Sequence, residues 1–513
     1  MSKTKKTILF SIVSISALGI LAKACGLLRE GVIAACFGTS SQIDVFGLIT
    51  GYVTTIITIV ASSLAVSYYP YYIRNLQQKG EREASLQFSH IINQYFLFSV
   101  IFFVFILFCT SFIAHYISDK TPGIDYNSVY WTTCVIFSTV ITGGMTRLFV
   151  TALNGLRKYG WMQITQILYS LICMVLVVIF GSKYGIYILV FAFVLNSVLQ
   201  VSILWYVYFK GERCYRLELQ FNNSETLNSW KTIIPVFLGT ETYMLGLTID
   251  RTLGLSLGIE GAAAALNYAG ILFGLINMVV SGPISTVFCT EMYRNYYKTE
   301  QRDVLFENLG KIINHQAFIL IPLGVFLFIT VEDFVTVVLK RGAFNEQSVI
   351  MTASAFCMYA LGAPLNAMRG LFSGVHIALN DRTIPMRSGI IFLLVNFFMS
   401  WWLSKIWGIS GITVGALLAM LLAATYQLRM LTKKYAFSLH YFSKSFCKIV
   451  MASVCSAFVV YLIQFSWSGL SVYIRFILNS IVFGSIYVLA SHILHCDEFE
   501  LIKNRLMIRY KKE

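Results

Sequence analysis

The stretch ALGILAKACGLLREGVIAACFGTSSQIDVFGLIT, residues 17–50, decides how this chain folds. It holds most of one apolar segment, a turn-like Phe-Gly-Thr-Ser, and the start of a second apolar segment. Four charged residues interrupt these segments: Lys23, Arg29, Glu30 and Asp44. A charge at the centre of a membrane helix costs about 2.5–3.5 kcal/mol, so it is kept only where it faces a polar interior or has a function. We therefore predict membrane helices packed around a polar interior.

One face of the first segment is small and charged. At about 100° per residue, a narrow stripe of a helix here contains Gly19, Lys23, Gly26 and Glu30, with Arg29 at its edge. A face of this kind suits a helix that lines a cavity between packed helices, so we expect these residues to line one.

The composition is that of a polytopic membrane protein. Of 513 residues, 57% are hydrophobic and only 12% are charged, and the mean hydropathy is +0.72. Apolar windows long enough to cross a bilayer recur about fourteen times, which predicts an all-α protein with about 14 transmembrane helices. The sequence contains no nucleophile–base pair, metal-ligand cluster or phosphate-binding loop, so we predict neither an enzyme nor a bound cofactor.

The basic residues predict the orientation of the chain. Most of the 39 Lys and Arg residues fall in alternate loops, on the side that holds the N-terminus. Because cytoplasmic loops carry the excess of basic residues, we expect both termini in the cytoplasm of a bacterial inner-membrane protein. The net charge of +15 is then a signal of topology and of contact with anionic membrane lipids, and it does not indicate nucleic-acid binding.

The sequence also contains an internal repeat. REGVIAACFGTSSQIDVFGL (29–48) is similar to IDRTLGLSLGIEGAAAALNY (249–268) when Gly38 is aligned with Gly258. A second pair lies at nearly the same offset: TALNGLRKYG (151–160) and IALNDRTIPM (377–386). Six helices in each copy would give both copies the same orientation, hence a parallel repeat with a cavity where the lobes meet.

We predict three regions from this repeat. They are an N-terminal lobe of helices 1–6 (1–220), a C-terminal lobe of helices 7–12 (221–440), and two extra helices with a basic cytoplasmic tail (441–513). The seventh helix contains Pro235, Gly239, Gly246 and Gly254 and ends near Gly258. These residues would let the helix bend during transport, but close helix packing explains the glycines equally well.

Nine charged residues fall within predicted membrane helices or at their ends: Lys23, Arg29, Glu30, Asp44, Arg147, Glu241, Asp250, Arg251 and Arg369. One interpretation is that they neutralise one another in structural ion pairs. The other is that some of them bind an anion. Lys23 and Arg369 have no acid nearby in the sequence, which favours an anionic ligand for at least one of them.

The chain resembles the MurJ (MviN) family of lipid II flippases, in the multidrug/oligosaccharidyl-lipid/polysaccharide exporter superfamily. Four stretches carry the resemblance: GLLREGVIAACFGTSSQIDVF (26–46), TIDRTLGLSLGIEGAAAALNYA (248–269), LKRGAFNEQSVIMTASAFCMYALG (339–362) and FSGVHIALNDRTIP (372–385). The resemblance implies movement of a lipid-linked, pyrophosphate-bearing sugar from the inner to the outer leaflet by alternating access. It also implies a basic cavity, because pyrophosphate is anionic.

The resemblance assigns roles to residues of this chain. Lys23 and Arg29 stand at the family's basic helix-one positions, and Arg369 lies within a residue of a basic position on helix ten. With Arg251, these are our predicted substrate-binding residues. Glu30 and Asp44 stand at the family's acidic positions on helices one and two. With Glu241 and Asp250 from the set of charges in membrane helices, they are the predicted cavity acids, which would pair with the cations or act in gating.

The chain departs from the family pattern in two ways. Thr54-Thr55 and Gly270-Ile271 replace basic positions of helices two and eight, so the cavity is less positive than that of a typical member. The family's proposed cation-coupling site corresponds here to Asp250, Asn396, Ser400 and Thr413. Helix eleven has no carboxylate at that site. Coupling to sodium or to the membrane potential is therefore an expectation from the resemblance alone.

We predict a flippase for an undecaprenyl-pyrophosphate-linked saccharide, with lipid II, the peptidoglycan precursor, as the first choice. Capsule, exopolysaccharide or O-antigen repeat units are alternative cargoes on the same carrier. A cation-coupled drug exporter would prefer acidic cavity residues, and a membrane glycosyltransferase would need a large outer loop with catalytic carboxylates. An inactive scaffold in an envelope-synthesis complex also stays open. Expected partners are the lipid-linked glycan, membrane lipids and proteins of cell-wall or polysaccharide synthesis.

Overall fold

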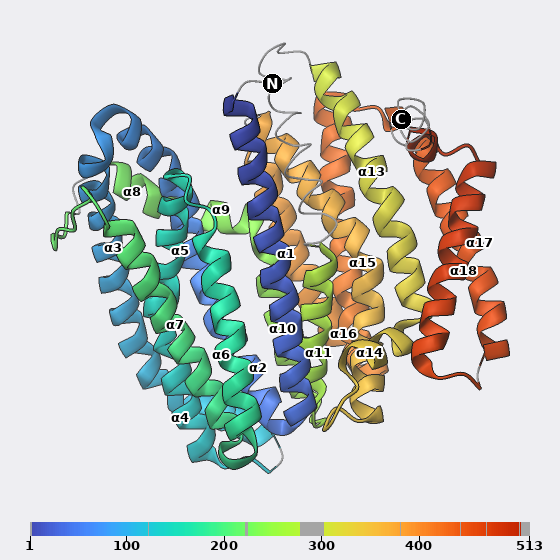
Figure 1. The fold of residues 1–513 in the computed structure, drawn as a ribbon, viewed down its shortest axis with the longest axis horizontal. Coiled ribbons are helices and arrows are strands. Elements are labelled where there is room, and N and C mark those ends of the chain that lie inside the picture. Colours follow the sequence, from blue (N-terminus) through green and yellow to red (C-terminus); the bar gives the residue numbers. More distant parts are fainter. Residues whose placement is uncertain are drawn as a thin grey trace. The chain divides into compact units, whose positions relative to one another are not determined.

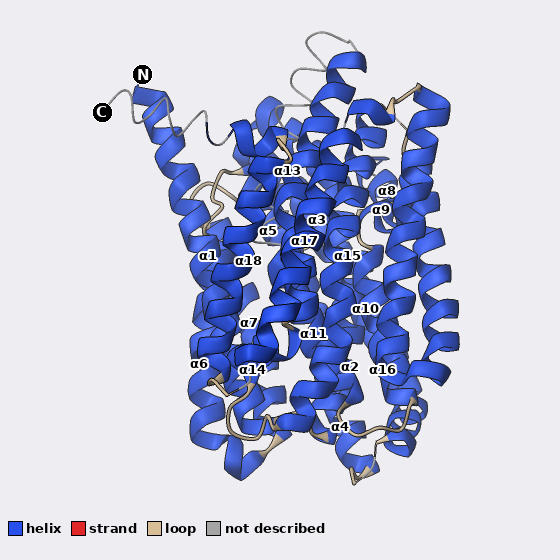
Figure 2. Ribbon diagram, turned by 90° about the vertical axis from the view of Figure 1, so that its right-hand side faces the viewer, coloured by secondary structure: helices blue, strands red, loops and turns tan. Residues whose placement is uncertain are grey.

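A computed structural model describes residues 3–121, 123–220, 224–277, 302–379, 381–441, 443–467, 469–501 and 503. Every regular element in these ranges is a helix and none is a strand, as Figure 2 shows. The prediction of an all-α protein is confirmed for this part of the chain. Part of the predicted span near residue 277, the basic loop after it and the end of the basic tail lie outside the described residues.

The described chain divides into two compact units. Unit 1 is Met1–Ala264 together with Arg341–Asn345, and unit 2 is Ala265–Lys340 together with Glu346–Glu513. Compactness and internal repetition are different properties, so this division is not a test of the lobe boundaries predicted from the repeat. Those boundaries stay a prediction.

Unit 1 is a bundle of long helices with three short ones. Its elements are α1 (Lys3–Phe37), α2 (Ser41–Ile57), the π-helical η1 (Thr58–Ser62), α3 (Ser63–Lys120), α4 (Tyr126–Phe137), α5 (Thr139–Gly155), α6 (Trp161–Tyr184), α7 (Ile186–Phe209), α8 (Ser224–Lys231), α9 (Ile233–Thr240) and α10 (Thr242–Ser256). α1 packs along α6, and α7 packs against both α5 and α6 (Figure 1). α11 (Ala262–Ile276) begins in unit 1 and continues into unit 2.

Unit 2 is also built from packed helices. Its elements are α13 (Arg302–Ile329), α14 (Val331–Leu339), α15 (Glu346–Ala378), α16 (Thr383–Tyr435), η3 (Leu439–Tyr441), α17 (Ser443–Ile463), η4 (Gln464–Trp467) and α18 (Val472–Ile493). α15 packs against α13 and α16, and α17 packs against α13 and α18. The pair α17 and α18, drawn in red in Figure 1, corresponds to the two helices predicted beyond the repeat.

Nine stretches of the described chain are long and apolar enough to cross a membrane. Two of them contain a break: Gly80 within α3 has φ 83°, and Gly408 within α16 has φ 56°. Glycine adopts this left-handed conformation at no steric cost, so each break lets one long helical stretch form two helices with almost no loop. The stretches confirm a protein that crosses the membrane several times, and the count of fourteen crossings stays a prediction.

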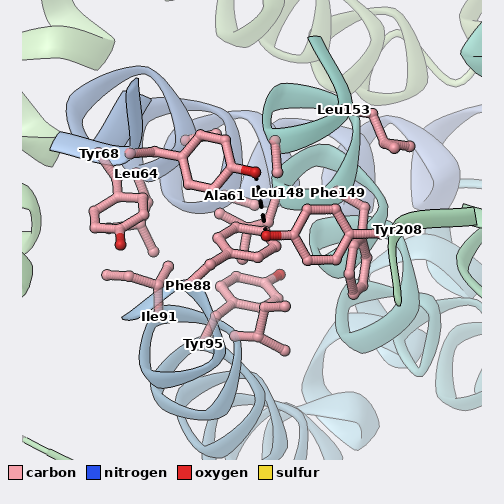
Figure 3. Close-up of a cluster of buried hydrophobic side chains, with 14 of the residues drawn as sticks. Ala61, Leu64, Tyr68, Phe88, Ile91, Tyr95, Leu148, Phe149, Leu153 and Tyr208 are labelled. Carbon is pink, nitrogen blue, oxygen red and sulfur yellow. Dashed lines mark hydrogen bonds between the residues drawn. The ribbon is translucent and has the colours of Figure 1, made fainter. Parts of the chain in front are cut away.

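Aromatic side chains form the core that holds α3, α5 and α7 together (Figure 3). The Phe88 ring meets Phe149 with centroids 5.7 Å apart and Tyr208 with centroids 5.0 Å apart. Three tyrosine hydroxyls are paired inside the core: the Tyr208 hydroxyl is 3.2 Å from that of Tyr72, and the Tyr95 hydroxyl donates to the Val140 carbonyl at 2.8 Å. Burial of these rings therefore leaves no unpaired hydroxyl at those three positions.

A carboxylate fixes the turn between α15 and α16 in unit 2. Asp381 accepts hydrogen bonds from the Thr383 hydroxyl at 2.6 Å and the Tyr435 hydroxyl at 3.1 Å, and it pairs with Lys434. Burial alone would raise the pKa of Asp381, but the hydrogen bonds from Lys434, Thr383 and Tyr435 outweigh it and hold the pKa well below its ordinary value. The turn between the two helices is thus tied to the far end of α16.

The aromatic core predicts a cost for any side chain at Gly144 on α5. A Cβ built there lies 1.7 Å from the Tyr95 hydroxyl oxygen, so Gly144→Ala must displace a buried ring and its hydrogen bond to Val140. We expect a loss of about 1–3 kcal/mol in thermal unfolding of the purified protein. Gly484→Ala on α18 is the control, because a Cβ there meets no described atom within 4 Å. Equal stability of the two variants would contradict this account of the core.

Candidate functional site: charged groups on membrane helices

The stripe predicted on the first helix lies on α1, and its small residues are not covered by neighbouring atoms. A Cβ built on Gly19 or Gly26 meets no described atom within 4 Å. Lys23, between them, is half-buried. This part of α1 therefore has open space beside its glycines, and its lining of a cavity stays a prediction.

Arg29 is already paired inside unit 1. Its Nε lies 3.1 Å from Oε1 of Glu30, and a second guanidinium nitrogen bonds the same oxygen. The guanidinium also stacks over the ring of Tyr169 on α6, 4.6 Å from the ring centroid. Arg29 and Glu30 thus follow the first interpretation of the sequence, in which charged residues neutralise one another in a structural ion pair.

Lys23 and Arg147 differ from Arg29 in this respect. No salt bridge joins either cation to an acid within the described ranges. Lys23 lies within electrostatic range of Arg147 on α5 and of Arg29, and Arg147 lies within range of Glu241. The sequence placed Arg147 among the buried charges but did not predict it as a binding residue. It carries no motif that could have singled it out.

Glu241 occupies a break in the predicted seventh helix. α9 ends at Thr240 and α10 begins at Thr242, and the intervening Glu241 has φ −113° and ψ 6°. Its N–H still donates to the Phe237 carbonyl at 2.9 Å, so the chain stays nearly continuous. Discontinuous membrane helices often carry binding residues at the break. The interruption agrees with a helix able to bend, while bending during transport stays a prediction.

Asp44 stabilises the start of another helix. Its carboxylate accepts the backbone N–H of Gly261 at 2.7 Å and of Ala264 at 2.6 Å, at the N-terminal end of α11. In the opposite direction, Glu260 accepts the Ser41 hydroxyl at 2.9 Å at the start of α2. Helix N-termini leave N–H groups unpaired and favour negative charge, so two acids cap two helices reciprocally.

The reciprocal caps follow the internal repeat. Gly38 and Gly258, which the repeat aligns, both adopt positive φ, at 58° and 67°. The same alignment places Glu260 opposite Ser40, beside the start of α2. The predicted site did not include Glu260. A residue-by-residue comparison of the two repeat copies could have identified it.

Polar groups also line the contact between α2 and α10. Arg251 Nη1 lies 3.5 Å from the Gly47 carbonyl oxygen, and Asp250 beside it is only 1% exposed. The Thr55 and Thr248 hydroxyls are 2.7 Å apart. At one position where the resemblance leads us to expect a cation, this chain thus has a hydroxyl pair that joins two helices.

In unit 2, the predicted residues lie on α15 and α16. Arg369 is 8% exposed and its guanidinium lies 4.9 Å from the Phe392 ring centroid. The Ser400 hydroxyl is 3.1 Å from Asn396 Oδ1 and donates to the Ile412 carbonyl at 2.8 Å. Thr413 donates instead to Ser410 on its own helix. The structure brings Asn396 and Ser400 together. Within the described ranges, no three His, Cys, Asp or Glu residues are grouped to hold a metal ion.

A family model described as "Lipid II flippase MurJ" matches residues 33–485. The chain belongs to this family. A probable lipid II flippase MurJ from Rickettsia prowazekii is 22% identical over 474 residues, covering 89% of this chain and 90% of the relative. One from Thermotoga maritima is 24% identical over 246 residues, 48% of each chain. The MurJ family resemblance of the sequence is thereby confirmed.

The fold is also that of MurJ. A solved structure titled "Lipid II flippase MurJ, inward closed conformation" superposes with a TM-score of 0.78 at 17% identity, covering 94% of this chain and 99% of the other. An inward-facing multidrug resistance MATE family transporter gives a TM-score of 0.66 at 14% identity, covering 81% and 96%. The chain therefore shares its overall fold with a MATE family transporter as well.

The Asp44 cap predicts a large effect for one substitution. Asp44→Ala removes the acceptor of two buried N–H groups, so we expect a loss of about 1–3 kcal/mol in thermal unfolding of the purified protein. Asp125→Ala is the matched control, because Asp125 caps α4 at an exposed site with one bond, to the Asn127 N–H. We expect a smaller loss there. A loss at Asp44 no greater than at Asp125 would refute the capping role.

Proposed function

We propose that this chain is a transporter that flips lipid II, an undecaprenyl-pyrophosphate-linked saccharide, from the inner to the outer leaflet of the bacterial inner membrane. The observation that carries the proposal is the match to the MurJ family model over residues 33–485. The MurJ-like fold supports it, as does the half-buried Lys23 on the open face of α1.

The cations of the membrane helices would bind the pyrophosphate. Lys23 is the first ligand, because it has no ion-pair partner among the described acids. Arg29 would join it when the Glu30 contact opens. Arg251 and Arg369 are the remaining predicted ligands. Charge attraction in a site with little water is far stronger than in solution, so a few cations suffice to hold a dianion.

The acids would act in pairing and gating. Glu30 holds Arg29, and Asp44 holds the start of α11. Release of the Asp44 cap would free the N-terminus of α11, and the break at Glu241 would let α9 and α10 change their angle. Asp250 is the fourth predicted acid. In this proposal these contacts open and close as the chain alternates between its two access states.

We infer a topology of fourteen crossings with both termini in the cytoplasm. Two parallel repeats of six helices (1–220 and 221–440) would be followed by two further helices (441–513). The inference is supported by the nine apolar stretches, two of which are broken at Gly80 and Gly408 and are each long enough to cross twice. The excess of basic residues in alternate loops supports the orientation.

For the driving force we propose the membrane potential or a sodium gradient. In the sodium case, the oxygens of Asp250, Asn396 and Thr413 would hold the cation. Asn396 Oδ1 lies 3.1 Å from the Ser400 hydroxyl, and the Thr413 hydroxyl donates to the Ser410 carbonyl on its own helix. We favour coupling to the membrane potential, because it acts on the charge of the substrate without a dedicated site. Proteins of cell-wall or polysaccharide synthesis would be partners that supply or consume the glycan.

Complementation tests the proposed function. The chain is expressed in a bacterium depleted of its own lipid II flippase, and growth and lipid II on the outer face are measured. We expect rescue by the wild type and by Lys183→Ala, an exposed basic residue at the end of α6, and no rescue by Lys23→Ala. All variants must insert in the membrane to comparable levels.

Failure of the wild type despite good insertion would overturn lipid II as cargo. It would favour the repeat unit of a capsule, exopolysaccharide or O-antigen on the same lipid carrier. Rescue by Lys23→Ala at the wild-type level would instead leave lipid II as cargo and remove the assigned role of Lys23.

A further inference from the structure

We propose that Arg147 on α5 is a second phosphate-binding cation beside Lys23, and that it exchanges Glu241 for the diphosphate group of the substrate. This inference rests on the proposed function, because a diphosphate-bearing lipid is the ligand. It adds a residue that the sequence did not assign, and it links ligand binding to the break between α9 and α10.

The first support is the difference between the three cations of this cluster. Arg29 bonds Glu30 and stacks on Tyr169, so its charge is balanced within the protein. Neither Lys23 nor Arg147 has a salt bridge to a described acid. Two like charges held within range of each other on membrane helices repel, and a bound dianion removes that repulsion.

The second support is the place of Arg147 in the fold. The residues that follow it, Leu148 and Phe149, are buried in the aromatic core, which fixes this turn of α5. Thr151 bonds back to the Arg147 carbonyl at 3.1 Å. Arg147 itself is half-buried, so its guanidinium extends from a rigid turn. A rigid helix positions a binding group more precisely than a loop does.

The third support is the position of Glu241. α5 and α9 both pack against the π-helical η1, so the two helices share a neighbour. Glu241 is the acid that acts on Arg147, and it lies at the break between α9 and α10. An acid at a break can move away with little loss of helix structure. A diphosphate that takes its place on Arg147 would therefore release Glu241 and allow α9 and α10 to change their angle.

Binding of inorganic pyrophosphate to the purified full-length chain in nanodiscs tests the proposal. Calorimetry gives the dissociation constant for the wild type, Arg147→Gln, Glu241→Gln and the double variant. We expect Arg147→Gln to weaken binding about tenfold or more, and Glu241→Gln to tighten it several-fold by removing the competing carboxylate. The gain from Glu241→Gln must disappear in the double variant, because the exchange acts through Arg147.

Two further variants keep the test decisive. Arg147→Lys retains a cation at the site and should bind more tightly than Arg147→Gln. If Arg147→Gln does not fold, Arg147→Lys is compared with the wild type instead, and weaker binding by Arg147→Lys is expected. Lys183→Gln is the control for general loss of positive charge and should bind as the wild type does. Wild-type affinity in Arg147→Gln would overturn the proposal, as would a gain from Glu241→Gln that persists without Arg147.

The same variants separate this inference from the proposed function. A wild type that flips lipid II while Arg147→Gln binds pyrophosphate normally would overturn the role of Arg147 and leave the flippase standing. A wild type that binds pyrophosphate through Arg147 but does not flip lipid II would support the anion site and overturn the cargo. Absence of pyrophosphate binding in the wild type would overturn the inference directly.

Discussion

The cost of holding a charge inside a membrane helix is the constraint on which this structure depends. Each charged group must pair, cap a helix end or face a polar space. Arg29 pairs with Glu30, Asp44 caps α11, and Lys23 lies beside open space on α1. The same constraint therefore produces three different roles, and only the third leaves a cation free to bind a ligand.

The same backbone arrangement accompanies a capping acid at two places in the chain. Gly38 and Gly258 each end a helix with positive φ, and the chain then begins α2 and α11, whose N-termini are capped by Glu260 and Asp44. At both places, the chain leaves its helical conformation beside an acid that caps the next helix. The break at Glu241 follows the same rule, because the acid occupies the position where α9 and α10 separate.

Much of the fold could be predicted from the sequence, because apolar windows and the repeat depend on local composition. The polar stretch 77–83 marks a loop at Gly80, but composition does not show that this loop, or the one at Gly408, is reduced to a single glycine with positive φ. The site was predictable only in part. Lys23 was evident as a charge without a nearby acid, whereas Arg147 becomes a candidate only when packing brings α5 within range of Lys23. Such pairings depend on tertiary structure.

The most direct measurement is the rate at which the purified chain moves fluorescent lipid II across the bilayer of reconstituted liposomes with an imposed membrane potential. The account predicts flipping well above that of protein-free liposomes, with a rate that falls when Lys23 is replaced by alanine and is kept when Lys183 is replaced. A wild-type rate equal to that of empty liposomes, with the protein folded and correctly inserted, would contradict the account.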